Sequence, residues 1–120
     1  DRIGGIATSG WRGRSLSFGI ADSVTVLAQN AAAADVAASL IANAITISSP
    51  AITRQPAASL VPDSDLKDRL VTVDVGPLSA NEIDQALAAG AGLARQMCDG
   101  GQIMTAYARL GRRSFVIASE

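Results

Sequence analysis

The stretch that decides the fold is residues 30–47, NAAAADVAASLIANAITI. Asn30 is a suitable N-cap, because its side-chain oxygen can accept a hydrogen bond from an amide of the first turn. Alanine, which follows it, loses least on entering a helix. We therefore predict a helix here. Its polar side chains Asp35, Ser39 and Asn43 are spaced four apart and form one narrow stripe along it.

A helix that is apolar on its other faces is normally buried. A buried carboxylate needs a partner, a hydrogen bond or a metal, because desolvating it alone costs several kcal/mol. Asp35 is therefore the most informative residue of this helix. A simpler interpretation is that Asp35 lies partly solvated in the first turns, where the helix dipole favours a negative charge. The sequence leaves both interpretations open.

Composition narrows the classes of function. The chain has 120 residues, 48% hydrophobic but only 3% aromatic, so we treat residues 1–120 as one domain with an aliphatic core. A net charge of −1 predicts no nucleic-acid partner. The absence of histidine excludes histidine metal sites and Ser/His or Cys/His catalysis within the chain. The single cysteine, Cys98, excludes an intrachain disulfide, and we expect it to be unreactive because no base is at hand.

Targeting signals are not visible in this sequence. No apolar run reaches the roughly 18–20 residues of a membrane span. The chain starts at Asp1 without a signal-like segment. We therefore expect a processed, nicked or truncated product with a cytoplasmic location.

Strands are predicted at residues 4–9, around Val24 in residues 17–28, and at residues 69–75, where β-branched residues alternate with others. Residues 48–68 contain Pro50, Pro56 and Pro62, which predicts an irregular surface crossover.

A second helix is predicted from Ser79 onward. Ser79 with Glu82 three residues later forms a capping box, and residues 99–101, DGG, end the helix. Gly90 and Gly92 weaken its middle by about 1 kcal/mol each, and we interpret them as a close approach of helix to sheet.

The tail predicts a hairpin, with strands at residues 102–109 and 112–118 turning near Gly111. Together the elements predict an α+β fold, with an antiparallel or mixed sheet and two main helices packed on one side.

The first candidate site is a loop of glycines, hydroxyls and arginines: Thr8, Ser9, Gly10, Trp11, Arg12, Gly13 and Arg14. Glycines let the backbone approach a ligand, and hydroxyls and amides can hold an anion. The arginines can clamp a phosphate or carboxylate, and the indole can stack on a ring. The alternative is a plain β-turn with solvated arginines. No GxGxxG or Walker loop is present.

The second candidate is a metal site at Asp35 and Ser39. They stand one helical turn apart, and a carboxylate with a hydroxyl suits Mg²⁺. Other segments must complete such a site, and Asp22 is either a neighbouring ligand or a turn aspartate. Residues 62–68, PDSDLKD, are interpreted as a solvated acidic loop.

Three segments carry a resemblance to a known family: ATSG at residues 7–10, SVTV at residues 23–26 and ADVAAS at residues 34–39. Residues 3–45, and more weakly the chain to about residue 80, resemble the C-terminal half of an uncharacterised bacterial and archaeal family. That family is related to ApbE, the FAD:protein FMN transferase once called a thiamine-biosynthesis lipoprotein. The transferases carry H-I-x-D-P-x-T-G between the first two segments, where this chain has only residues 13–22.

The resemblance implies a site and cofactors. Asp35 and Ser39 would hold Mg²⁺ beside the FAD pyrophosphate, with Ser39 in the place of a threonine. Thr8, Ser9, Gly10 and Arg12 would bind the FAD or FMN cofactor.

The resemblance also implies that the chain is half of a larger ApbE-like fold. It would be completed by an N-terminal segment on a separate chain or by another copy in a homo-oligomer. Three functions follow: a Mg²⁺-assisted flavin transferase, a non-catalytic module binding a flavin, nucleotide or anion, or a hydrolase on the same scaffold. The hydrolase ranks last, because Asp1 is a poor N-terminal nucleophile.

Overall fold

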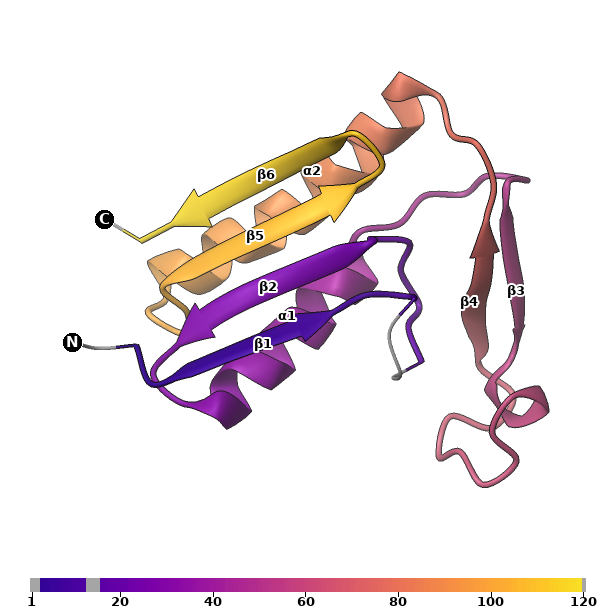
Figure 1. Ribbon diagram of the computed structural model, residues 1–120, viewed down its shortest axis with the longest axis horizontal. Coiled ribbons are helices and arrows are strands. Elements are labelled where there is room, and N and C mark those ends of the chain that lie inside the picture. Colours follow the sequence, from indigo (N-terminus) through magenta and orange to yellow (C-terminus); the bar gives the residue numbers. More distant parts are fainter. Residues whose placement is uncertain (1–2, 13–15, 120) are drawn as a thin grey trace.

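The computed structural model of the chain describes residues 3–12 and 16–119. Its main layer is a four-stranded antiparallel sheet in the order β1-β2-β5-β6. The strands are β1 Gly5–Ser9, β2 Ser23–Ala28, β5 Thr105–Leu110 and β6 Arg113–Ala118. Helices α1, Ala31–Ala44, and α2, Ala80–Asp99, both lie behind one face of this sheet (Figure 1). The predicted α+β class is confirmed, and the sheet is antiparallel.

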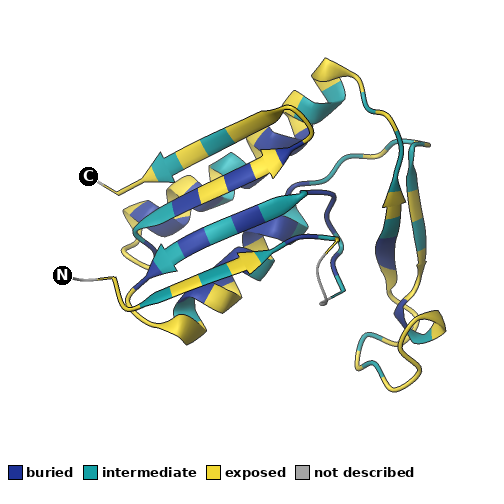
Figure 2. Ribbon diagram, viewed as in Figure 1, coloured by how far each residue is buried: buried dark blue, intermediate teal, exposed yellow. Residues whose placement is uncertain are grey.

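The core lies between the sheet and the two helices. Alternate residues of the central strands point toward the helices and are fully buried, among them Val24, Val26, Ala106 and Ala108. Figure 2 shows this alternation along β2 and β5. Because side chains alternate between the faces of a strand, the residues between them lie on the open face.

Helix α1 begins where predicted but ends earlier, at Ala44. Asn30 is its N-cap and accepts a hydrogen bond from the Ala33 N–H at 2.8 Å. The prediction of a helix buried on almost all sides is wrong, because Val36 is 59% and Leu40 48% exposed. The sheet and α2 cover only one side of α1. The exposed side borders an apolar groove of about 450 Å³ that reaches Met97 of α2.

Helix α2 forms with the predicted capping box. The Ser79 hydroxyl accepts from the Glu82 N–H at 3.1 Å, and the Glu82 carboxylate accepts from the Ser79 N–H at 2.9 Å. The interpretation of the helix glycines is wrong. A methyl group on Gly90 would overlap Ile45, just past α1, so this is a helix–helix approach, while Gly92 faces open space.

Residues 48–68 are more ordered than predicted. They contain the strand β3, Ile52–Pro56, which pairs antiparallel with β4, Leu70–Val75, and a short 3₁₀ turn, η1, Ala57–Ser59. The prolines did not prevent a strand, because Pro56 is the last residue of β3 and Pro50 precedes it, positions that a strand at a sheet edge tolerates. Figure 1 shows the β3–β4 ribbon standing beside the main sheet.

Arg54 attaches this ribbon to the body of the protein. Its guanidinium donates to Phe18 O at 2.6 Å, to Thr46 Oγ1 at 2.8 Å and to Thr72 Oγ1 at 3.1 Å. Thr72 is therefore buried beside Val71, so β4 is buried at its centre on both faces rather than on the single face predicted. The polar stripe of α1 contributes Asn43, whose Oδ1 accepts from the Ser17 hydroxyl at 3.1 Å and the Phe18 N–H at 3.0 Å.

The β5–β6 hairpin turns at Gly111, as predicted, with a φ of +61° that favours glycine. No helix in the described part of the chain has both the length and the apolarity of a membrane span.

Candidate functional site

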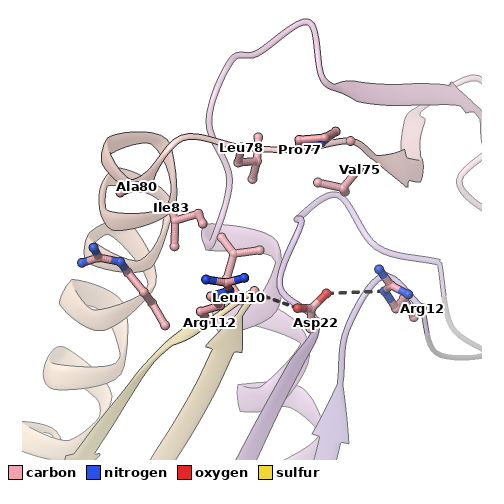
Figure 3. Close-up of a pocket in the computed structure, with 12 residues that line it drawn as sticks. Arg12, Asp22, Val75, Pro77, Leu78, Ala80, Ile83, Leu110 and Arg112 are labelled. Atoms are coloured by element: carbon pink, nitrogen blue, oxygen red, sulfur yellow. Dashed lines mark hydrogen bonds and ion pairs between the residues drawn. The ribbon is translucent and has the colours of Figure 1, made fainter.

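A pocket of about 540 Å³ lies at the end of the sheet where β1 stops and β2 starts (Figure 3). Four segments meet there: the chain after β1, the start of β2, the β5–β6 turn and the β4–α2 loop. One wall is apolar and consists of Val75, Pro77, Leu78, Ile83 and Leu110. The charged residues of the lining are Arg12, Asp22, Arg112 and Arg113. We call this the arginine pocket.

Asp22 connects three of the four segments. Its Oδ2 accepts a hydrogen bond from the Gly111 N–H at 2.8 Å, and its Oδ1 lies 3.4 Å from Nε of Arg12 (Figure 3). Its own N–H donates to Arg109 O at 2.9 Å. Of the two interpretations of Asp22 from the sequence, the turn aspartate describes this role better than the metal ligand beside Asp35. Asp22 and Asp35 lie apart in the fold, because Asp22 precedes β2 and α1 begins past the opposite end of that strand.

The arginines of the pocket differ in their partners. Arg113 forms an ion pair with Asp84 at 2.9 Å. The Arg12 side chain is 67% exposed, and its guanidinium carbon lies 4.8 Å from the centre of the Trp11 ring. Arg112 stands in the β5–β6 turn, and within residues 3–12 and 16–119 no ion pair involves it. The pocket therefore presents cationic groups that can meet an anion.

Only part of the predicted anion loop reaches this pocket. Arg12 lines it, whereas the Thr8 hydroxyl lies 3.0 Å from that of Thr25 on the open sheet face. Ser9 is half-buried and pairs with Val24, on the helix side of the sheet. Gly10 is buried, and a methyl group there would lie 2.5 Å from Asp22 O, so only glycine permits this approach. Gly13 and Arg14 lie outside the described residues.

The predicted metal pair lies elsewhere, on α1. Asp35 is exposed, Ser39 is half-buried, and neither lines the arginine pocket. Among the residues that the structure describes, no three acidic or cysteine side chains gather as a metal site. The types of Asp35 and Ser39 fit Mg²⁺, but two oxygens do not complete its six-coordinate shell. A metal at this position stays a prediction.

Several functional candidates were missed from the sequence. Arg112, Arg113 and the apolar wall were not singled out, although residues 109–113, RLGRR, place three arginines around the predicted turn. Cys98 is buried, and this burial raises the pKa of its thiol, which agrees with the expected lack of reactivity. The acidic loop is solvated as expected, with Asp63, Asp65 and Asp68 exposed.

Comparison with known proteins gives one match. No curated protein and no solved structure matches the chain. The model of the family described as AbpE bacteria matches residues 1–116, and the chain therefore belongs to that family.

Proposed function

We propose that the chain is an ApbE-like protein that binds a flavin nucleotide, with the phosphate of the ligand in the arginine pocket. One observation carries this proposal. Arg12, Arg112 and Arg113 line the same pocket as a wall of aliphatic side chains. A volume of about 540 Å³ falls within the range of small-molecule sites.

The two halves of the pocket suit the two halves of such a ligand. Guanidinium groups bind phosphate through paired, charge-assisted hydrogen bonds. The side chains of Val75, Leu78 and Ile83 can pack against a flat ring system. The choice of a flavin among ring phosphates is supported by the ATSG and SVTV segments and by a family name close to ApbE.

Binding can be measured by quenching of flavin fluorescence. We expect FMN and FAD to bind at least about tenfold more tightly than riboflavin, which has the ring but no phosphate. Arg112→Ala should weaken FMN binding about five- to tenfold and leave riboflavin binding unchanged. Arg95→Ala is the matched control, because Arg95 is exposed on α2 and does not line the pocket. Equal loss of FMN affinity in the two variants would show that overall charge, and not this pocket, holds the phosphate.

A second candidate function is Mg²⁺-dependent transfer of FMN from FAD. It is supported by the carboxylate of Asp35, which is exposed and so accessible to a ligand or another chain, one turn from Ser39. Other ligands would come from phosphate, water, a separate N-terminal chain or a second copy.

This activity has its own assay. Release of AMP from FAD should depend on Mg²⁺ and be lost in Asp35→Ala, while Asp63→Ala, at another exposed acid, keeps it. AMP release that is equal with and without Mg²⁺ would argue against it.

A further inference from the structure

The charges that line the arginine pocket do not cancel. Among the described residues, the guanidinium groups of Arg12, Arg112 and Arg113 share the lining with the carboxylate of Asp22, so positive charge is in excess. Arg109 of β5 borders Asp22 in an adjoining hollow and adds a further positive charge at the same end of the sheet. An anion in this pocket therefore meets a net positive surrounding.

The ion pairs at the pocket do not use all of its arginines. Oδ1 of Asp22 lies 3.4 Å from Nε of Arg12. Asp84, on α2 and outside the lining, pairs with Arg113 at 2.9 Å. As far as the structure describes the chain, Arg112 belongs to neither pair. Arg112 therefore offers an uncompensated charge to a ligand.

The arginines of the pocket are also open to water. The side chain of Arg12 is 67% exposed and that of Arg113 is 50% exposed. A phosphate bound to such groups keeps part of its hydration, which limits the cost of desolvating a second negative charge. The attraction to the positive pocket, in contrast, grows with each charge that the ligand carries.

Phosphates differ in charge according to their ester bonds. A phosphomonoester carries about 1.5 to 2 negative charges near pH 7, because its second pKa is about 6. A phosphodiester carries one. A monoester also presents three terminal oxygens to guanidinium groups, which bind phosphate through paired hydrogen bonds. Charge and geometry therefore both favour the monoester in this pocket.

We propose that the arginine pocket selects a terminal phosphate dianion, such as the phosphomonoester of FMN, over phosphates that are esterified twice. This inference rests on the proposed function, because it names the phosphate class of that same site. Arg112 acts as the specificity-determining residue, since it supplies the uncompensated charge. FAD, whose two phosphates both lie inside the molecule, is then a weaker ligand of this pocket than FMN.

Two probes with the same ring separate the two phosphate classes. FMN is a monoester, riboflavin 4′,5′-cyclic phosphate is a diester, and both report through flavin fluorescence. At about pH 7.5 we expect the unmodified protein to bind FMN at least about fivefold more tightly than the cyclic phosphate. Arg112→Gln keeps a hydrogen-bond donor and removes the charge. It should weaken FMN binding about tenfold and that of the cyclic phosphate about threefold, so the preference falls.

Asp84 permits the opposite change. Asp84→Asn removes the carboxylate that is paired with Arg113 and leaves the lining residues as they are. It should tighten FMN binding about threefold and that of the cyclic phosphate about 1.5-fold, so the preference widens. Asp63→Asn, which removes an exposed charge elsewhere, should leave the ratio unchanged. A merely structural role of Arg112 or Asp84 would change both affinities by the same factor.

The pH dependence of binding gives a test that needs no variant. The chain contains no histidine, the side chain that ordinarily titrates between pH 5 and pH 8. Glu82, at the start of α2, has its pKa held below 4.5 by the bond from the Ser79 N–H. The remaining charged groups at the pocket are its arginines, Asp22 and Asp84.

The phosphate of FMN is therefore the group expected to take up a proton between about pH 7.5 and pH 5.5. The affinity for FMN should fall about two- to threefold over this range, because the phosphate loses its second charge. The affinity for the cyclic phosphate should stay constant. Parallel pH curves for the two probes would refute the inference.

The outcomes distinguish the two proposals. Equal affinity for both probes in the unmodified protein, or tighter binding of the cyclic phosphate, would overturn the selectivity and leave flavin binding intact. An unchanged ratio in Arg112→Gln would overturn the role of Arg112. No binding of either probe would overturn the proposed function and this inference with it.

Discussion

Gly90 permits a quantitative test of how the two helices pack. Alanine is favoured over glycine inside a helix by about 1 kcal/mol. At Gly90 the added methyl would lie 2.9 Å from Cδ1 of Ile45 and closer still to its Cγ1. Ile45 is fully buried, and its N–H donates to Ile41 O and Ala42 O, so it cannot move aside freely. Overpacking of this kind costs about 1–3 kcal/mol.

Gly92 is the matched control, because a methyl there meets nothing within 4 Å. Gly92→Ala should therefore raise the free energy of unfolding by up to about 1 kcal/mol, and Gly90→Ala should lower it by up to about 2 kcal/mol. The propensity gain is common to both variants, so their difference isolates the packing cost of about 1–3 kcal/mol.

Urea unfolding followed by far-ultraviolet circular dichroism measures both free energies. In a double-mutant cycle, Ile45→Ala should be less destabilising in the Gly90→Ala background than in the unmodified chain, because the methyl fills part of the space. Equal stability of Gly90→Ala and Gly92→Ala would refute the inferred contact between α2 and Ile45.

Three further predictions concern other parts of the fold. Asn30→Ala should lower the free energy of unfolding by about 1 kcal/mol, because the Ala33 N–H loses its capping hydrogen bond. Urea titration measures this change, and unchanged stability would refute the role of Asn30 as the N-cap. The hydrogen bond from the Ser79 N–H holds the pKa of Glu82 below its usual value of 4.5. The ionised carboxylate of Glu82 therefore stabilises the fold above pH 4.5, and this contribution to the free energy of unfolding is lost as the pH falls through the lowered pKa. Glu82→Gln should reduce the loss of unfolding free energy at acidic pH, and an unchanged pH dependence of stability would count against the capping box. Arg54→Lys should speed amide hydrogen exchange in the β3–β4 ribbon, because one ammonium cannot reproduce the bonds to Phe18, Thr46 and Thr72, and unchanged exchange would show that the ribbon is held otherwise.

Elements with a strong local signal were predictable. The capping box at Ser79 and Glu82, the N-cap at Asn30 and the turn at Gly111 all depend on residues a few positions apart, and each is present. The strand β3 was missed because the prolines around it suggested irregular structure, while its pairing with β4 depends on residues farther along the chain. The exposure of α1 was also missed, because an alanine-rich sequence does not say how many layers cover a helix.

For the candidate site too, some predictions from the sequence agree with the structure and others do not. Arg12 was singled out from its glycine-rich surroundings, and it lines the arginine pocket. Thr8 and Ser9 were singled out with it, but strand alternation places their side chains on opposite faces of the sheet, away from that pocket. Asp35 and Ser39 remain a predicted metal pair on one helix.

The sequence by itself determined the α+β class, the caps and turns of its elements and that no histidine of this chain takes part in a site. These depend on composition and on interactions between near neighbours in the chain. Only the tertiary structure brought Asp22 within 2.8 Å of Gly111, 89 residues away, and placed both beside Arg12 and the β4–α2 loop. The physical reason is that strand order and hairpin register decide which distant residues share a sheet edge, and the spacing of residues along the chain does not encode that order directly.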